Sequence, residues 1–388
     1  MFEIQTKNKI TSQGLDLFDR AKYNISETCE APDAIIVRSA NLLNENFGSG
    51  LKSIARAGAG YNNIPVEACS ERGIVVFNTP AQNANAVKEL TVAALVLASR
   101  NVIDAVNWAK TLKSDVAKEV ESGKAQFVGH EILGKTLGII GMGAVGSRTA
   151  NAGVALGMEV LGVDPYMTIE NALSLSRSVK IAKERDDIFA KSDYIALHTT
   201  LTPETKYVIN EQNIAKMKDG VRIINFTRAD TVDDDAMAAA LERGKVAKYV
   251  TDFPNEKVLQ MKNTIAIPHL AASTEESEEN CAIMAATQLI DFLENGNIKN
   301  SVNYPELIME RSTDYRICIF HKNISGAISK ITSAISELGI NIEHFTNRSK
   351  GDYAYTVCDI NGKIPDGLLS TISGINDMIR INVIHEPI

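Results

Sequence analysis

The stretch Thr136-Leu-Gly-Ile-Ile-Gly-Met-Gly-Ala-Val-Gly146 decides the fold. It begins as a short apolar run typical of a buried strand, and a helical pattern follows over Val145 to Gly157. Between the two, Gly141, Gly143 and Gly146 satisfy the G-x-G-x-x-G spacing. A strand that turns into a helix through such glycines is typical of a doubly wound parallel sheet, so we expect an α/β fold.

Each glycine of this turn has a physical reason. Gly141 permits the tight turn, Gly143 lets a pyrophosphate approach the backbone, and Gly146 lets the helix pack closely on the strand. The helix N-terminus then faces the anion. We therefore expect Gly141, Gly143, Gly146 and the first helical residues, Ala144 and Val145, to bind a dinucleotide. The alternative is a tight turn that binds no ligand.

A second strand, over Glu159 to Val163, ends at Asp164, about twenty residues beyond the glycines, as a dinucleotide site requires. The Asp164 carboxylate can accept hydrogen bonds from ribose hydroxyls and would repel a 2′-phosphate. This pattern favours NAD over NADP. In the alternative interpretation, Asp164 only starts a turn before Pro165.

Strand and helix patterns alternate along most of the chain, which indicates parallel sheets. A helix is expected over Ala84 to Arg100 and another over Val102 to Glu121. From Arg316 the order becomes β-α-β-β-α-β, the ferredoxin-like plan. The 388 residues suggest two or three domains. We predict a first domain over 1–98 with a return segment at 276–301, a second over 99–275 and a third over 314–388.

Composition and charge exclude several classes of protein. Hydrophobic residues make up 45% and charged residues 23% of the chain, and the net charge is −8. Nucleic acid and anionic membranes are therefore not expected partners. No signal peptide and no apolar run of about eighteen residues is evident. The five cysteines form no CxxC and no cluster has metal-ligand spacing, so we expect reduced thiols, no metal and a cytoplasmic location.

Several sequence blocks stand in a specific order: Arg56-Ala-Gly-Ala-Gly-Tyr-Asn-Asn-Ile64, Asn225-Phe-Thr-Arg228 and Ile267-Pro-His-Leu-Ala-Ala-Ser-Thr-Glu-Glu276. With them, the chain from Ala34 to Ser301 resembles the D-isomer-specific 2-hydroxyacid dehydrogenases. The resemblance implies a flavodoxin-like substrate domain and a Rossmann-type NAD domain. It also implies that His198, Thr199 and Thr227 lie near the cofactor, although His198 can equally be a structural support.

The resemblance implies a catalytic set of Arg228, Glu256 and His269. Oxidation of a 2-hydroxy acid sends a hydride from C2 to the nicotinamide while the hydroxyl loses a proton. His269 suits the base, since histidine titrates near neutrality. Glu256 would orient the imidazole, and Arg228 would grip the substrate carboxylate. The alternative partner is Asp252, because the spacing of Asp252-Phe-Pro-Asn-Glu256 departs by one residue from the family pattern.

Substrate choice is expected to depend on the turn at Arg56, Ala57 and Gly58, whose backbone N–H groups can bind a carboxylate. Arg56, Arg38 and Lys124 can add positive charge for a phosphate, although each can instead be a solvated surface residue. In the phosphoglycerate dehydrogenase branch of the family the matching positions tend to be basic.

The segment Ile319-Phe-His-Lys-Asn-Ile-Ser-Gly326 and the later Gly339-Ile-Asn-Ile342 resemble an ACT regulatory domain. By that resemblance His321, Asn323 and Asn341 would contact an L-serine effector. Ser325 departs from the family pattern, where proline is usual. The alternative is an ACT domain used only for dimerisation.

Together these resemblances imply NAD-dependent oxidation of D-3-phosphoglycerate to 3-phosphohydroxypyruvate, the first step of L-serine biosynthesis, by a homodimer or homotetramer. One alternative is a reductase for glyoxylate, hydroxypyruvate or another 2-oxo acid, which would share every catalytic residue. An alternative of another class is an NAD(H)-sensing binding protein on the same fold.

Overall fold

Two parallel sheets and one antiparallel sheet organise the chain in the computed structural model, which describes residues 1–385. The chain divides into two compact units: Met1–Asn83 joins the segment that begins at Glu275, and Ala84–Thr274 forms the second unit. The last three residues of the expected 314–388 domain lie outside the described residues. The predicted α/β class with a ferredoxin-like third domain is confirmed.

The second unit contains a seven-stranded parallel sheet in the order β12-β11-β10-β9-β6-β7-β8. Its strands are β6 (Thr136–Ile140), β7 (Glu159–Val163), β8 (Lys180–Ile181), β9 (Tyr194–Leu197), β10 (Val221–Asn225), β11 (Val246–Thr251) and β12 (Thr264–Ala266). Strands β6 and β9 pair in parallel. From this pair the chain adds strands outward in both directions, β7 and β8 on one side and β10 to β12 on the other, so the direction of the strand order reverses here. In open α/β sheets such a reversal is where ligands bind.

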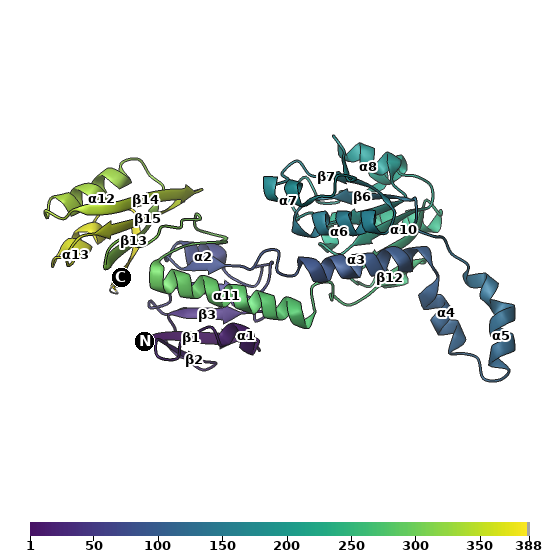
Figure 1. Cartoon of the computed structure of the whole chain (residues 1–388), viewed down its shortest axis with the longest axis horizontal. Coiled ribbons are helices and arrows are strands. Elements are labelled where there is room, and N and C mark those ends of the chain that lie inside the picture. The colour runs from purple at the N-terminus through teal and green to yellow at the C-terminus, as the bar shows by residue number, and fades with distance from the viewer. Residues whose placement is uncertain (386–388) are drawn as a thin grey trace. The chain divides into compact units, whose positions relative to one another are not determined.

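Helices cover this sheet (Figure 1). The helices of this unit that lie against the sheet are α3 (Ala84–Ser99), α6 (Ala144–Ala155), α7 (Ile169–Ser174), α8 (Arg185–Lys191), α9 (Glu211–Lys216) and α10 (Asp234–Glu242). The unit also contains α4 (Val102–Ala109), α5 (Val116–Gly123) and short 3-10 turns at η1 (Lys124–Phe127), η2 (Ala229–Thr231) and η3 (Val258–Gln260). Helix α3 buries Val87, Ala94 and Leu95 in one core with β6 and β10, so it belongs to this unit although the sequence suggested a boundary near residue 98.

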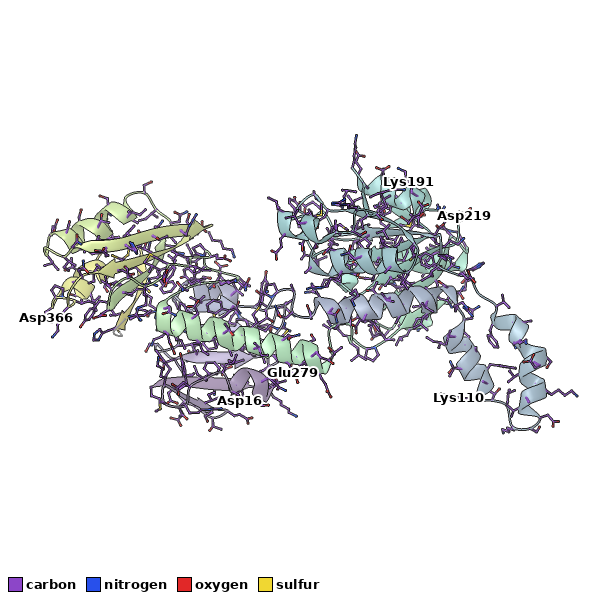
Figure 2. All side chains as sticks on the ribbon, in the orientation of Figure 1. Asp16, Lys110, Lys191, Asp219, Glu279 and Asp366 are labelled. Carbon is purple, nitrogen blue, oxygen red and sulfur yellow. The ribbon has the colours of Figure 1, made fainter. Side chains whose placement is uncertain are left out.

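The prediction of a single helix over Val102 to Glu121 is wrong. The chain instead forms α4 and α5, joined by a turn that starts at Lys110, which Figure 2 labels. Asp115 adopts a left-handed conformation (φ 46°), which a continuing helix does not allow. Neither helix buries a residue, and both project from the rest of the second unit (Figure 1).

The first unit begins with a five-stranded parallel sheet in the order β2-β1-β3-β4-β5, the flavodoxin-like order. Its elements are β1 (Phe2–Lys7), α1 (Ser12–Leu15), β2 (Tyr23–Ser26), β3 (Ala34–Val37), β4 (Ser53–Arg56), α2 (Val66–Ser70), β5 (Val75–Phe77) and the long α11 (Glu275–Asn295). The run Ala34–Val37 is entirely buried, as expected of a strand covered on both faces.

The C-terminal part of the first unit has the predicted β-α-β-β-α-β order. Its elements are β13 (Tyr315–Lys322), α12 (Ala327–Ser336), β14 (Ile342–Lys350), β15 (Tyr353–Ile360), α13 (Leu368–Ser373) and β16 (Met378–His385). The antiparallel sheet runs β14-β15-β13-β16. Strand β13 alternates: Ile317 and Ile319 pack in the core with α12 and α13, whereas Cys318 and Phe320 pack in the core that contains α11. Through this second core, one face of the antiparallel sheet packs against the first domain.

Several features concern the whole described chain. Among residues 1–385, no helix is both long and apolar enough to cross a membrane. All five cysteines lie within these residues and none forms a disulfide. No group of three or more metal-ligating side chains is arranged around a common point in this part of the chain.

A buried arginine joins the C-terminal sheet to the first domain. Arg316 and Asp359 are both fully buried, and the guanidinium Nε and Nη2 donate to the two carboxylate oxygens at 2.6 and 3.0 Å. Nη1 also donates to the carbonyls of Asn295, the last residue of α11, and Met309 at 2.6 and 2.8 Å. Burial alone would raise the pKa of Asp359, but Arg316 holds it below its ordinary value. The arginine therefore caps α11 and neutralises the buried Asp359 carboxylate.

We expect Arg316→Ala to lower the free energy of unfolding by about 3–5 kcal/mol, because Asp359 would stay buried without its partner. Urea denaturation of the full chain, followed by circular dichroism, measures the change. Lys191→Ala is the matched control: Lys191, labelled in Figure 2, forms an exposed ion pair with Asp187 and should leave the midpoint nearly unchanged. Equal midpoints for Arg316→Ala and the wild type would contradict the assigned role.

Candidate active site

The predicted cofactor and catalytic residues of the second unit all follow the carboxyl ends of its strands. In spatial order across the sheet these residues are His269 after β12, Asp252 after β11, Thr227 and Arg228 after β10, His198 and Thr199 after β9, the glycine loop after β6, and Asp164 after β7. Parallel strands bring their carboxyl ends to one edge, so residues far apart in sequence form one site.

The glycine loop has the geometry that a dinucleotide needs. Gly141 has φ +96°, and a Cβ there would lie 2.5 Å from the His198 carbonyl oxygen. A Cβ at Gly146 would overlap the carbonyl oxygen of Gly141, whereas one at Gly143 would meet no atom within 4 Å. Helix α6 begins at Ala144, so the first backbone N–H groups of Ala144 and Val145 have no intrahelical partner. The space beside Gly143 and these N–H groups fit a pyrophosphate.

Asp164 supports the glycine loop through both of its carboxylate oxygens. Its Oδ2 accepts a hydrogen bond from the Met142 N–H at 2.8 Å, and its Oδ1 accepts one from the Tyr166 N–H at 2.8 Å. Met142 itself is fully buried. Each carboxylate oxygen keeps a further lone pair for a ribose hydroxyl. The turn role and the ribose role, which the sequence presented as alternatives, are therefore compatible.

His198 lies between the glycine loop and the rest of the edge. Its N–H donates to the Ile140 carbonyl at 2.8 Å, while its Nε2 is buried and has no hydrogen-bond partner within residues 1–385. Burial lowers the pKa of His198 to about 4, so the imidazole is neutral at physiological pH. Thr227 donates its hydroxyl proton to the Thr199 carbonyl, which joins the ends of β9 and β10.

Arg228 is presented by a fixed backbone. The Asn225 side-chain amide and the Thr231 hydroxyl both donate to its carbonyl, at 3.0 and 2.7 Å. Asn225 and Thr231 are fully buried, whereas the Arg228 side chain is exposed. An exposed guanidinium on a rigid turn can meet an anionic ligand in a bidentate manner.

His269 is exposed, and its ring packs beside the ring of Phe253. The His269 and Phe253 ring centroids are 4.8 Å apart. Asp252 is fully buried, its Oδ2 accepts the Ala271 N–H at 3.1 Å, and His269 is one of the charges that act on its carboxyl. Glu256, by contrast, is exposed and makes no hydrogen bond or ion pair within the described residues. Of the two carboxylates that the sequence left open as partners, Asp252 is the buried one and Glu256 the solvated one.

Several of the residues expected to bind the substrate already have hydrogen-bond or ion-pair partners within the chain. The Ala57 N–H donates to the Val37 carbonyl at 2.8 Å and the Gly58 N–H to the Arg56 carbonyl at 2.9 Å, so neither is available for a carboxylate. Arg38 pairs with Glu278 at 2.5 Å. In the part of the chain that the structure describes, the N–H groups of Ala59 and Gly60 are the ones in this turn without a partner.

Lys124, predicted to bind the substrate, and His321, predicted to bind the effector, also have partners within the chain. Lys124 belongs to the second unit, where its exposed side chain pairs with Glu121. His321 is 2% exposed, and its ring nitrogens bond to the Lys322 carbonyl at 2.8 Å and the Thr356 hydroxyl at 3.0 Å. His321 therefore does not face solvent as an effector ligand would, because strand alternation turns it inward.

Asn323 and Asn341, the other predicted effector residues, are exposed. The Asn323 amide donates to the Gly351 carbonyl at 3.1 Å, and the Asn341 carbonyl accepts the Asn361 N–H at 3.2 Å. The Asn341 side chain makes no hydrogen bond within residues 1–385. Of the three, Asn341 keeps its whole side chain available for a ligand, and Asn323 keeps its Oδ1.

Sequence reasoning did not assign roles to Asn225 and Thr231, which fix the Arg228 backbone. The signal for Asn225 was present, because a fully buried amide at the end of an apolar strand needs hydrogen-bond partners. Thr231 had no such signal, since its position relative to Arg228 depends on the 3-10 turn η2.

Comparison with known proteins identifies the family. Residues 92–271 match the model described as D-isomer specific 2-hydroxyacid dehydrogenase, NAD binding domain. A hydroxypyruvate reductase of Thermotoga maritima is 34% identical over 287 residues, which cover 71% of this chain and 88% of that protein. The chain belongs to the D-isomer-specific 2-hydroxyacid dehydrogenase family. Its second unit is the family's NAD-binding domain, so the cofactor is NAD.

Other members of the family extend the likeness. A D-3-phosphoglycerate dehydrogenase of Synechocystis sp. is 33% identical over 367 residues, which cover 90% of this chain. The chain spans 63% of the length of that relative. The NAD+-bound 3-phosphoglycerate dehydrogenase of Entamoeba histolytica superposes with a TM-score of 0.61 at 28% identity, over 79% of this chain and 99% of that one.

Two glycine substitutions should separate folding from cofactor binding. Gly143→Ala should leave the melting temperature of the cofactor-free protein unchanged, since a Cβ there meets no atom, but should abolish most of the NADH-induced increase. Gly146→Ala should lower the melting temperature without NADH, because its Cβ would overlap the Gly141 carbonyl. Thermal unfolding with and without NADH measures both. Full stabilisation of Gly143→Ala by NADH would contradict the pyrophosphate assignment.

Proposed function

We propose that this family member oxidises D-3-phosphoglycerate to 3-phosphohydroxypyruvate with NAD, the first step of L-serine biosynthesis. The observation that carries the proposal is the order of groups along one sheet edge, from Asp164 and the glycine loop to Arg228 and His269. A dinucleotide with its ribose at Asp164 and its pyrophosphate at Gly143 would extend toward the strands that carry the catalytic residues. The phosphorylated substrate is supported by relatives such as the Synechocystis dehydrogenase.

In this proposal each residue has a separate task. Arg228 binds the substrate carboxylate and polarises the C2 oxygen. His269 takes the hydroxyl proton during oxidation and returns it during reduction. NAD, when bound, accepts the hydride that leaves C2. His198 is neutral, so it adds no charge beside the site. Glu256, expected to assist His269, stays a prediction.

The strongest alternative is a reductase for hydroxypyruvate, glyoxylate or another 2-oxo acid. The likeness to the Thermotoga maritima hydroxypyruvate reductase favours it, and it needs the same Arg228 and His269. The internal partners of Arg38 and Lys124 also weaken the argument for a ready phosphate site. An NAD(H)-sensing protein without turnover is the third candidate, and it leaves the exposed Arg228 and His269 unexplained.

A homodimer is proposed because α4 and α5 are amphipathic but bury no residue in the single chain. Val102, Val106 and Val116 are 43%, 46% and 48% exposed. Apolar side chains on projecting helices are typical of an interface with a second copy. A homotetramer, the cytoplasmic location and the L-serine effector stay predictions.

Loss of NADH absorbance with 3-phosphohydroxypyruvate, glyoxylate, hydroxypyruvate and 2-oxoglutarate tests the substrate. We expect kcat/KM to be highest for the phosphorylated acid. A higher kcat/KM for hydroxypyruvate would instead support the reductase, and no turnover despite NADH binding would support the sensor. The same assay with L-serine tests the effector, which fails if both rate and KM are unchanged.

His269→Ala should lower kcat by about 10²–10⁴-fold, the usual contribution of a general base, while NADH affinity stays within twofold of wild type. Stopped-flow turnover and NADH fluorescence titration measure the two quantities. Leu270→Ala, an exposed neighbour on the same loop, is the matched control. Unchanged kcat in His269→Ala would remove His269 from the mechanism.

A further inference from the structure

Two strand ends of the first sheet bring an arginine beside the predicted substrate turn. Val37 and Arg56 are the last residues of β3 and β4, and they are partners in the parallel register. The Ala57 N–H donates to the Val37 carbonyl at 2.8 Å, so the turn is held against the end of β3, where Arg38 follows. Open α/β sheets bind ligands outside the carboxyl ends of their strands. Arg38 and the turn therefore belong to the edge where such a sheet binds its ligand.

A second arginine lies against the same turn. A Cβ at Gly58 would overlap Nη1 of Arg56, so this guanidinium packs over the turn. Burial raises the pKa of Cys281 on α11, and the positive charges of Arg38 and Arg56 oppose that effect. Arginines from two neighbouring strands thus lie within electrostatic range of one residue of α11. Their charges converge at this edge of the sheet, which favours an anionic ligand.

A carboxylate of α11 already occupies one of these arginines. Nη1 of Arg38 and Oε2 of Glu278 are 2.5 Å apart. Glu278 lies in the first turn of α11, three residues before Cys281, and therefore on the same face of the helix. The side chains of Arg38 and Glu278 are 33% and 35% exposed. Solvent, and hence a dissolved anion, can reach the pair.

The ion pair can be exchanged for a ligand. A partly exposed ion pair contributes little to stability, because water competes for both charges. A phosphate dianion carries more charge than a carboxylate and can accept two parallel hydrogen bonds from one guanidinium. Glu278 and a phosphate cannot both face Arg38 without repulsion between their negative charges. A phosphate that binds Arg38 therefore displaces Glu278.

The exchange discriminates between anions by their number of contacts. An acid with a carboxylate and a phosphate has two groups to place: the carboxylate at the turn, where the N–H groups of Ala59 and Gly60 have no partner within residues 1–385, and the phosphate at Arg38. Inorganic phosphate has only the second contact, and an unphosphorylated acid has only the first. Attachment at the turn raises the effective concentration of the phosphate at Arg38, which offsets the loss of the Glu278 ion pair.

We propose that Glu278 is a displaceable counter-ion of Arg38 that determines which anions this edge accepts. The phosphate of a phosphorylated 2-hydroxy acid replaces it, an unphosphorylated acid leaves it in place, and inorganic phosphate alone is disfavoured. This inference rests on the proposed function, which supplies the two kinds of acid. Glu278 forms no bond with either substrate and takes part in no proton transfer, so it is a specificity residue rather than a catalytic one.

The first test does not depend on turnover. Isothermal titration calorimetry measures the dissociation constant of inorganic phosphate with the full-length protein. Glu278→Gln should bind phosphate at least about fivefold more tightly than the wild type, because no carboxylate competes for Arg38. The double variant Arg38→Gln/Glu278→Gln should lose this gain. Glu279→Gln is the matched control: Glu279, labelled in Figure 2, is the next residue of α11 and accepts a solvent-exposed hydrogen bond from Gln13 at 2.6 Å.

The second test compares two acids under turnover. The KM for 3-phosphohydroxypyruvate should fall about fivefold in Glu278→Gln, whereas the KM for hydroxypyruvate should change less than about twofold. A purely structural role would change both KM values together, or lower the melting temperature. Glu279→Gln should leave both KM values unchanged. If Glu278→Gln does not fold, Glu278→Ala also removes the carboxylate and replaces it in both tests.

The outcomes separate the inference from the proposed function. Tighter phosphate binding and a lower KM for the phosphorylated acid in Glu278→Gln, both absent from Glu279→Gln, support the inference. Equal phosphate affinity in Glu278→Gln and the wild type overturns it, as does an unchanged ratio of the two KM values or a gain that persists without Arg38. Absence of turnover in the wild type rejects the proposed function, while the phosphate titration still decides whether Glu278 shields Arg38.

Discussion

The carbonyl oxygen of Gly141 occupies the space that any side chain at Gly146 would need, and this constraint determines the cofactor domain. Because α6 approaches β6 so closely, its first turn lies directly over the carboxyl end of the strand. The N–H groups of that turn and the open space at Gly143 then fit the proposed pyrophosphate position. Asp164 fixes the loop through the Met142 N–H, so the proposed ribose and pyrophosphate positions have a defined separation.

The same sheet edge arranges groups of different electrostatic character. His198 is neutral because burial lowers its pKa to about 4, whereas Arg228 and His269 are exposed to solvent. Asp252 is the buried acid between β11 and the histidine loop. Titratable groups of different burial and charge therefore lie along one sheet edge, an arrangement typical of functional sites.

The C-terminal domain depends on a different kind of constraint. Its sheet is covered on both faces, by α12 and α13 on one side and by the core around α11 on the other. Arg316 completes this second face, since its guanidinium satisfies the last carbonyl of α11 and the Asp359 carboxylate together. His321 is turned into the same domain and bonds to Thr356. The domain is thereby a folded continuation of the first unit rather than an appended segment.

The sequence by itself determined the α/β class, the order of the C-terminal elements, the glycine loop and the positions of Arg228 and His269, because each depends on local periodicity or on residues close together in the chain. It could not decide between Asp252 and Glu256, since four residues separate them and only folding shows that one is buried and the other solvated. The break between α4 and α5 and the internal partners of Arg38 and His321 were likewise decided by tertiary structure. In each case the deciding factor was a contact or a solvent exposure, and neither is encoded in the local pattern of residues.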